Sequence, residues 1–376
     1  MRFITPKIFL MSKNSTHSCF FMMFISVSAI AQDSTLHPSF TFSFYADAFI
    51  AYYTDSVGLD EYQKFPSISP RSSQFGLNVA LFSAKYTSEK VRSTITLHYG
   101  DVPRSTWSTT FNFIQEANAG VRLCKNFWLD AGFFRTHVGT EGLFPKENIT
   151  SSVAIPTYFE PYYEAGLKLS YAPTEKFALN LYVLNGYNLF EDNNKKKSLG
   201  LLATYAINDH LSVGYDNYIG DESPDEDTIN HLRFYNNVFL NFEKNKIKIV
   251  TGGDVCFQQN AANAGTELTG TVVSGLLAIR IMVANHFDVY GRIEGYYDPD
   301  GILSGLIVAK GLSSGSGLKL WGATLGIEYK PTDNSYVRLE GRDLSTTDSG
   351  QKIFYWNNKY TNSRFEALLN IGVWFP

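Results

Sequence analysis

The sequence predicts an all-β fold: a transmembrane antiparallel up-and-down β-barrel of about 16 strands, with 14 to 18 as the accepted range. Three observations predict it. Apolar and polar residues alternate with period two along most of the chain, as in a strand with two different faces. Short polar turns alternate with long connections rich in Gly, Ser, Asp and Asn. No segment after residue 31 reaches the run of about 18 apolar residues expected of a membrane-spanning helix.

The composition excludes several classes of protein. Aromatic residues make up 15% of the 376 residues and charged residues only 18%, whereas a disordered chain is poor in aromatics and rich in charge. The net charge of −4 provides no basic field for a nucleic-acid backbone, so we expect no nucleic-acid partner. Three cysteines are too few for a disulfide scaffold or a multi-cysteine metal site, and we expect no metal and no cofactor.

Residues 1–31 have the features of a secretory signal peptide. Arg2, Lys7 and Lys13 precede a short apolar run that ends in Ser28-Ala-Ile-Ala31. About 13 apolar residues are too few for a spanning helix, which needs about 20. We expect cleavage after Ala31, which leaves residues 32–376 as a single barrel domain. Its two cysteines, Cys124 and Cys256, are expected to remain free thiols because they fall on separate predicted strands.

The alternation can be followed residue by residue in several segments. In 365–375 every odd-numbered position is apolar, whereas Glu366, Asn370 and Gly372 lie between them. In 321–329 the odd-numbered positions are again apolar. In 74–81 we assign Phe75, Leu77, Val79 and Leu81 to a single lipid-facing side. Each pattern favours a strand with one face toward lipid and the other toward a polar interior.

The connections between these strands are of two kinds, and the two kinds alternate strictly. Seven short turns lie near 88–90, 125–126, 173–175, 208–209, 244–245, 285–286 and 331–333. Eight long loops lie at about 54–72, 100–108, 136–160, 188–197, 219–231, 258–270, 297–317 and 343–362. Fifteen connections imply 16 strands, with both chain ends on the short-turn side. This layout is typical of bacterial outer-membrane barrels, which have an even strand count and long outer loops.

The competing fold is a soluble secreted β-sandwich or propeller. A bilayer offers no water to backbone N–H and C=O groups, so a sheet can cross it only as a closed barrel. Aromatic residues favour the membrane alternative because they gather where strands meet turns, in doublets such as Tyr52-Tyr53, Phe234-Tyr235 and Tyr296-Tyr297. Tyr and Trp are enriched at membrane interfaces, where one end of the side chain is apolar and the other is wet.

From about residue 40 onward the chain resembles the OmpL-like β-barrel porins of Gram-negative outer membranes. The resemblance is carried by the segments 130–142 (DAGFFRTHVGTEG), 158–166 (YFEPYYEAG) and 183–187 (VLNGY). It implies an outer-membrane channel with no catalytic residues to carry over. The expected partners are outer-membrane lipid and lipopolysaccharide, the barrel-assembly machinery and small polar solutes. A homotrimer and a monomer both remain open.

Charged residues in mid-strand are expected to face inward, because a lipid-facing Arg or Lys costs about 2–4 kcal/mol at the membrane centre. The predicted inward acids are Asp47, Glu116, Asp130, Glu164, Asp216, Asp254, Asp288, Glu294, Glu328, Glu340 and Glu366. The predicted inward bases are Arg92, Arg122, Lys168, Arg233, Lys248, Arg280, Arg292, Arg338 and Arg342. These nearly balanced charges form no ring of one sign. Two roles remain possible for them: salt bridges between neighbouring strands that hold the wall in shape, or a transverse field that aligns polar solutes. Arg135 fits neither face.

Loop 136–160 is the third long loop and among the longest. In general porins the third outer loop often folds into the lumen. By that analogy Lys146, Glu147 and Asn148 would line a constriction. An external loop packed on its neighbours is the alternative.

The predicted function is passive diffusion of small hydrophilic solutes through a water-filled barrel. One alternative is a plugged structural or adhesive barrel without channel activity. A second is a hydrolase at the barrel rim, because Gly311-Leu-Ser-Ser-Gly315 matches the G-x-S-x-G letters. That motif requires a strand before it and a helix after it, whereas here it lies in a Gly/Ser-rich loop followed by a strand. We therefore expect no enzyme. The carboxylates of Asp221–Asp227 and Asp298–Gly301 lack the remaining ligands of a calcium loop and are expected to be solvated.

Overall fold

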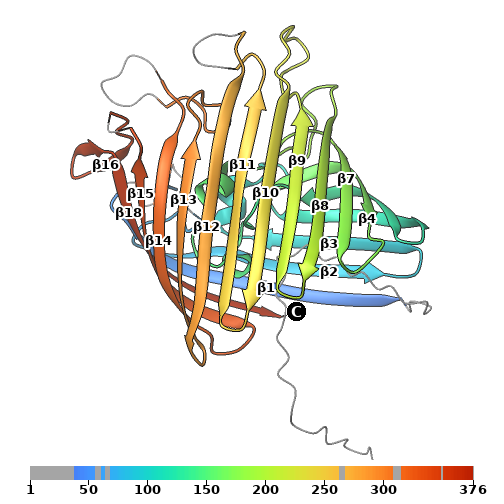
Figure 1. Ribbon diagram of the computed structural model, residues 1–376, viewed down its shortest axis with the longest axis horizontal. Helices are drawn as coiled ribbons and strands as arrows, with labels where there is room; N and C mark the ends of the chain where they lie inside the picture. The colour runs from blue at the N-terminus through green and yellow to red at the C-terminus, as the bar shows by residue number, and fades with distance from the viewer. Residues whose placement is uncertain are drawn as a thin grey trace, which may run out of the picture.

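A computed structural model describes residues 38–55, 61–63, 68–261, 267–307, 315–348 and 350–375. The expected signal peptide, its cleavage after Ala31 and most of the Gly311–Gly315 motif lie outside these residues. Sixteen strands form one closed antiparallel barrel, which confirms the predicted fold class and strand number (Figure 1). No helix in the part of the chain that the structure describes is long and apolar enough to span a membrane.

The barrel strands follow one another around the ring in sequence order. The sixteenth barrel strand is labelled β18 because β16 and β17 form a separate hairpin. Their bounds are β1 (Ser39–Tyr53), β2 (Phe75–Thr87), β3 (Val91–Tyr99), β4 (Ile114–Cys124), β5 (Phe127–Arg135), β6 (Tyr163–Tyr171), β7 (Phe177–Leu184), β8 (Ser198–Asn208), β9 (Leu211–Gly220), β10 (Arg233–Lys244), β11 (Ile247–Gln258), β12 (Gly270–Ala284), β13 (Phe287–Tyr297), β14 (Lys319–Tyr329), β15 (Ser335–Thr346) and β18 (Ser363–Phe375). The short hairpin of β16 (Phe354–Trp356) and β17 (Lys359–Thr361) stands in the last long loop. Helix α1 (Asp101–Thr106) lies between β3 and β4.

The ring closes where the first strand pairs with the last. Tyr45 of β1 is opposite Trp374 of β18, and β18 also pairs with β15. Figure 1 shows the short turns of β8–β9 and β10–β11 at one end of the barrel, opposite the long loops. Several short turns contain a residue in the left-handed region, such as Asn126 (φ 67°) and Asn245 (φ 55°). Asn tolerates this conformation because its short polar side chain bonds locally.

The burial pattern is the reverse of that in a soluble protein. Apolar residues on the outer face are exposed, such as Ile293 (61%) and Leu339 (53%), while the adjacent Arg292 and Glu340 are each only 2% exposed. In β18, Phe365 and Ile371 are exposed, whereas Glu366 and Asn370 are fully buried. An apolar outer surface of this extent is stable only against an apolar medium such as lipid.

One predicted face assignment is wrong. Phe75 is exposed as predicted, but Leu81 is 8% exposed and packs inside, whereas its neighbour Phe82 is 51% exposed. The cause is a β-bulge. Asp47 of β1 is opposite Val79 while Ala48 is opposite Leu77, so Asn78 is an extra residue in β2. One extra residue reverses the alternation for the rest of the strand, because the side-chain period is two.

The aromatic doublets divide between the two surfaces. Tyr52, Phe234 and Tyr297 are exposed on the outside, as expected for residues at a membrane interface. Their neighbours Tyr53, Tyr235 and Tyr296 are buried inside the barrel. Tyr53 donates a hydrogen bond to the carbonyl oxygen of Ser69 at 2.6 Å and so holds the first long loop. Only one residue of each doublet therefore belongs to an interfacial belt.

Inward glycines accept aromatic rings from the neighbouring strand. A Cβ on Gly372 would lie 2.2 Å from Tyr336 Cζ, and a Cβ on Gly326 would lie 2.3 Å from Tyr290 Cζ. Both pairs are directly opposite in the register. Each ring lies flat across the strand, where the absence of a side chain leaves room. The two cysteines, Cys124 and Cys256, are free thiols, as predicted.

The outer face of β14 provides a test of the membrane orientation. Leu325 is 76% exposed near the middle of the strand, while Lys319 stands at its end in the same outward register, near the Tyr297 ring. Leu325→Arg should lower the free energy of unfolding in lipid bilayers by about 2–4 kcal/mol. Lys319→Arg, which keeps a cation at the end of the strand, should leave it unchanged. The measurement is denaturant unfolding in vesicles. Equal stability of Leu325→Arg and the unmodified protein would contradict a lipid-facing Leu325.

Candidate functional site

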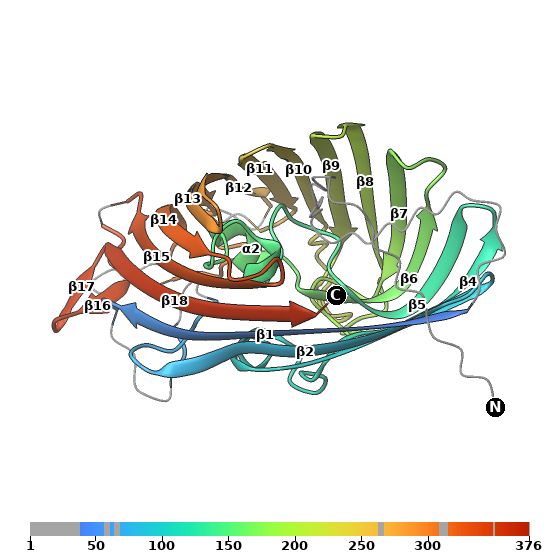
Figure 2. The same cartoon turned by 90° about the horizontal axis from the view of Figure 1, so that it is seen from below.

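The long loop between β5 and β6 crosses the interior of the barrel. It contains the single turn η1 (Pro145–Glu147) and the short helix α2 (Ile155–Phe159). It begins at β5 yet hydrogen-bonds to β13, which lies eight places away in the ring of 16 and so directly opposite. Its contacts with the inward side chains of Glu294 and Arg338 place the loop within the lumen. Figure 2 shows α2 inside the ring of strands.

The first residues of the loop are fixed by His137, which is 5% exposed. Its Nδ1 lies 2.7 Å from Glu164 Oε1 of β6, and its Nε2 lies 2.8 Å from the carbonyl oxygen of Asn217 of β9. The ring also stacks on Tyr182 of β7, with centroids 4.2 Å apart. Strands β6, β7 and β9 therefore hold the point at which the chain turns into the barrel.

The two ends of the loop cross at Gly139. Its φ is +112°, and a Cβ there would lie 2.0 Å from Glu160 Oε2, so only glycine fits this conformation and this contact. The N–H of Gly139 donates to Asp216 Oδ2 of β9 at 3.3 Å. Next along the chain, Thr140 Oγ1 accepts a hydrogen bond of 3.0 Å from Asn237 of β10.

The part of the loop nearest the short-turn end of the barrel is held by Arg338, the fourth residue of β15 counted from that end. Its guanidinium donates to three backbone carbonyl oxygens: Pro145 at 2.7 Å, Thr150 at 3.0 Å and Asn148 at 3.2 Å. The same guanidinium pairs with Glu328 of β14. The loop therefore descends deep into the barrel. The first long loop does so too, because its Ser69 hydroxyl accepts a hydrogen bond of 3.5 Å from Asn370, the residue opposite Arg338 in the register.

From Arg338 the loop returns along β13 and β15 toward the long-loop end of the barrel. Glu340 accepts the backbone N–H groups of Ser151 and Ser152 at 2.6 and 2.9 Å. Glu294 accepts the N–H of Ile155 at 2.6 Å, at the start of α2. These contacts place inward carboxylates at consecutive levels of the wall.

Arg292 of β13 makes the largest number of contacts with this rising segment. It donates to Thr150 Oγ1 at 2.6 Å, to the Ser152 carbonyl oxygen at 2.7 Å and to Glu141 Oε2 at 3.0 Å. Further hydrogen bonds reach the Ser152 hydroxyl and the Val153 carbonyl oxygen.

Arg292 and Arg338 dominate the attachment of the loop. Both side chains are almost completely buried, and the five-donor fork of arginine is directed at backbone oxygens of one segment. A hydrogen bond to a charged group contributes about 1.5–3 kcal/mol, more than a neutral one. Removal of either guanidinium would also leave carbonyl and carboxylate oxygens buried without partners, which is costly in a low-dielectric interior.

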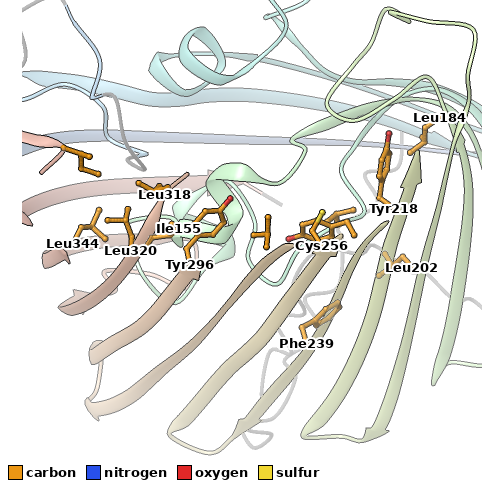
Figure 3. Close-up of a cluster of buried hydrophobic side chains, with 14 of the residues drawn as sticks. Ile155, Leu184, Leu202, Tyr218, Phe239, Cys256, Tyr296, Leu318, Leu320 and Leu344 are labelled. Atoms are coloured by element: carbon orange, nitrogen blue, oxygen red, sulfur yellow. The ribbon is translucent and has the colours of Figure 1, made fainter. Parts of the chain in front are cut away.

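An apolar cluster supports the loop from the outer half of the barrel. Val138 and Ile155 of the loop pack against inward side chains of β7 to β15, including Leu202, Tyr218, Phe239, Cys256 and Leu344 (Figure 3). The inner wall is therefore not uniformly polar. It carries apolar side chains where the loop packs and charged side chains elsewhere, so the loop is fixed by both burial and hydrogen bonds.

The three residues predicted to line a constriction have different surroundings. Asn148 is 8% exposed and folds back on its own loop, with Nδ2 donating to the Gly142 carbonyl oxygen at 2.7 Å. Glu147 forms a two-point ion pair with Arg135 at 2.6 Å, which explains why Arg135 fitted neither face of its strand. Lys146 is half-buried, with Nζ 4.5 Å from the centroid of the Tyr45 ring. Lys146 alone among the three keeps a partly exposed charged group.

The predicted inward charges fall mainly into three groups of cross-strand ion pairs. Asp130 accepts Arg92 Nε at 2.6 Å and lies 3.8 Å from Lys168 Nζ. Arg280 lies 3.4 Å from Asp288 and 3.7 Å from Glu328. The third group joins Glu294, which lies 3.2 Å from Arg292 and 2.8 Å from Arg342, to Glu366, 3.6 Å from Arg342.

The other predicted inward residues have mostly neutral partners. Asp47 accepts hydrogen bonds from Tyr336, Asn78 and Asn370. Asp254 bonds to Asn237 and Ser274, and Arg233 donates to Gln258 at 2.9 Å. Lys248 lies 3.7 Å from Glu243, and Arg122 lies near the Trp128 ring. Glu116 of β4 is half-buried.

Several residues that hold the interior together were not predicted from the sequence. Glu141 and Glu160 lie in the loop, Lys330 follows β14, and Arg364 of β18 pairs with Glu366 at 2.5 Å. Burial raises the pKa of Glu141 against the opposing charge of Arg292. Burial, together with the charges of Asp254 and Asp216, raises the pKa of Glu160. No periodic signal marks Glu141 or Glu160, because a loop has no fixed face, whereas Arg364 lies in β18 in the same inward register as Glu366.

The comparisons with known proteins agree with this architecture. Residues 39–375 match the family model described as "Putative beta-barrel porin-2, OmpL-like". No curated protein matches the sequence significantly.

Several solved structures share the fold. The anion-selective porin from Comamonas acidovorans superposes with a TM-score of 0.60 at 10% identity, over 90% of this chain and 100% of that one. The outer membrane channel DcaP of Acinetobacter baumannii gives a TM-score of 0.58 at 11% identity, over 89% and 97%. Outer-membrane expressed OmpT of Vibrio cholerae gives 0.57 at 12% identity, over 91% and 100%.

At these identities the structural likeness shows the fold alone. The family match covers nearly all of the described chain, from the first barrel strand to the last. The chain therefore belongs to the OmpL-like β-barrel porin-2 family of outer-membrane porins.

Proposed function

We propose that this protein is a passive diffusion channel for small hydrophilic solutes in the bacterial outer membrane, with its width set by the loop at 136–160. The observation that carries the proposal is the fixed position of this loop. It is held across a closed 16-strand ring by Arg292 and Arg338, and a ring of this size is wide enough to leave an aqueous channel. Transport would need no energy input.

The charged interior supports a water-filled path rather than a sealed core. Below the loop, the side chains of Arg92, Lys168 and Lys330 are 29%, 23% and 29% exposed, although they point into the barrel. Such exposure inside a closed ring requires space next to the charges. The proposed lining consists of Lys146 of the loop and the predicted inward residues that remain partly exposed: Arg92, Glu116, Arg122, Lys168, Arg233, Lys248 and Arg280.

The proposal includes no catalytic step. His98 is 3% exposed against the Trp107 ring, and both ring nitrogens of His137 face Glu164 and Asn217. In the described structure no hydrogen bond joins either imidazole to a serine, so neither His98 nor His137 supports the alternative of a rim hydrolase.

The assembly and surroundings follow from the same proposal. We expect outer-membrane lipid and lipopolysaccharide around the barrel, insertion by the barrel-assembly machinery and export with cleavage after Ala31. A homotrimer is the assembly to test, since one solved structure of Vibrio cholerae OmpT is described as a trimer form. Cross-linking in native membranes distinguishes trimer from monomer.

Channel activity is tested directly by reconstitution of the purified protein. We expect discrete current steps in planar bilayers and swelling of liposomes in small sugars, with rates that fall as sugar size increases. Folding is checked by different electrophoretic migration of boiled and unboiled samples. A folded protein that gives no steps and no swelling would instead be a plugged structural barrel.

Release of the loop should widen the channel. The double variant Arg292→Met/Arg338→Met removes the guanidinium groups that hold 145–153, so it should admit larger sugars and give larger, noisier current steps than the unmodified protein. Arg280→Met is the matched control for the sugar size limit, because Arg280 pairs with the wall carboxylates Asp288 and Glu328 and, in the described structure, has no ion pair with the loop. Should the double variant fold poorly, Arg292→Lys keeps the charge but loses the fork. An unchanged size limit in all folded variants would show that the loop does not set the width.

Lys146 should make the channel sensitive to pH. Burial, together with the nearby charges of Arg135 and Lys85, lowers the pKa of Lys146 to about 8. The ammonium group is present below that pH and is lost above it, so the loop loses a positive charge as pH rises from about 7 to about 9. The current carried by chloride relative to potassium should fall over this range, and less so in Lys146→Met. An identical pH response in the two proteins would rule out this role.

A further inference from the structure

We propose that the short-turn half of the lumen selects for small anions, such as inorganic phosphate and short carboxylates, over cations of similar size. This inference rests on the channel function proposed above and specifies its substrate class. It is carried by the unequal exposure of acids and bases in that half of the barrel.

The basic residues at this level form what we call the basic tier. Its members all lie near the short-turn ends of their strands: Lys85 (β2), Arg92 (β3), Arg122 (β4), Lys168 (β6), Arg280 (β12) and Lys330 (after β14). All six are half-buried rather than buried. They stand on two opposite parts of the wall, β2–β6 and β12–β14, so a solute in the lumen passes between them.

In each ion pair of the tier the base reaches toward water and the acid does not. Arg92 is 29% exposed and Lys168 is 23% exposed, while their shared partner Asp130 is 1% exposed. On the opposite wall, Arg280 and Lys330 are 19% and 29% exposed, whereas Asp288 and Glu328 are 3% and 1% exposed. The long stems of Arg and Lys lie over the short carboxylates and carry the cationic group outward.

The numbers of basic and acidic side chains at this level also indicate a positive lumen. Four of the six cations share three buried carboxylates, because Asp130 pairs with Arg92 and Lys168, and Asp288 and Glu328 pair with Arg280 and Lys330. Lys85 and Arg122 have no carboxylate within ion-pair distance in the described structure. Among the strand residues at or near this level, two acids reach water, namely Glu116 and Glu243, and Glu243 is matched by Lys248 at 3.7 Å. The exposed acids of the short turns are offset by exposed lysines there: the acids are Glu89, Glu175, Asp209 and Asp333, and the lysines are Lys90, Lys125, Lys176, Lys244 and Lys246. The water-facing charge is therefore positive on balance.

The carboxylates that have no cationic partner do not oppose this field from the path itself. Asp216, Asp254 and Glu160 are 0%, 3% and 4% exposed, sealed between the wall and the crossing loop. Asp47 is also fully buried, among Tyr336, Asn78 and Asn370. Like charges on opposite low-dielectric walls focus their field along the channel and raise the local concentration of the opposite ion.

The experiment measures the reversal potential of single channels under a KCl gradient. The unmodified protein should show a several-fold preference for chloride, larger at 0.1 M than at 1 M salt because the Debye length falls from about 10 Å to about 3 Å. Lys85→Glu/Arg122→Glu reverses two charges without breaking an ion pair and should abolish or invert the preference. Lys359→Glu makes the same kind of change on the hairpin outside the lumen and should have no effect.

Outcomes for the proposed function and for this inference are separable. If the folded, unmodified protein gave no current steps, the proposed channel function would be refuted. Steps with equal or greater potassium permeability in the unmodified protein would overturn the anion preference and leave the channel intact. A double variant that conducts with unchanged selectivity would equally refute the basic tier as its source. Flux of an uncharged sugar of similar size in liposomes should be the same in all variants, which controls for changes in width.

Discussion

The structure depends on the requirement that every backbone N–H and C=O inside a bilayer find a partner in the protein. Each of the sixteen barrel strands pairs with two neighbours, and the β1–β18 pairing removes the last free edge. Closure fixes which side of each strand meets lipid. Apolar side chains such as Ile293 and Leu339 then face outward, and charged side chains must share the interior. The polar lumen is thus a consequence of closing the sheet.

An interior formed in this way needs something to fill it, and the loop at 136–160 does so. Arg292 and Arg338 are too deeply buried to remain unpaired, and the loop supplies the carbonyl oxygens that satisfy them. The same hydrogen bonds from Arg292 and Arg338 hold this segment of the loop, which has no regular secondary structure, in one position. The loop is therefore part of the wall's electrostatic balance as well as an obstruction. A similar exchange occurs at Glu340 and Glu294, which accept loop N–H groups.

Side-chain length decides how charge is distributed across the thickness of the wall. Aspartate and glutamate are short, so Asp130 and Glu328 lie close to the strands and are buried. In the basic tier, the longer side chains of arginine and lysine reach over these carboxylates, and their cationic ends meet the lumen. A nearly neutral set of residues can therefore present one sign of charge to a solute. Counting charges by position in the sequence conceals this layering.

The sequence by itself determined the barrel, the sixteen strands and the inward placement of the charged residues, because period-two alternation and loop lengths are local properties. It did not determine the bulge at Asn78, which reverses the faces of β2, since one extra residue leaves the local pattern intact. It suggested a crossing loop by analogy only, and it missed Glu141, His137 and the Arg135–Glu147 pair. Those contacts join residues on different elements, often from opposite walls. Only closure of the ring brings them within hydrogen-bonding distance, so only the tertiary structure could decide them.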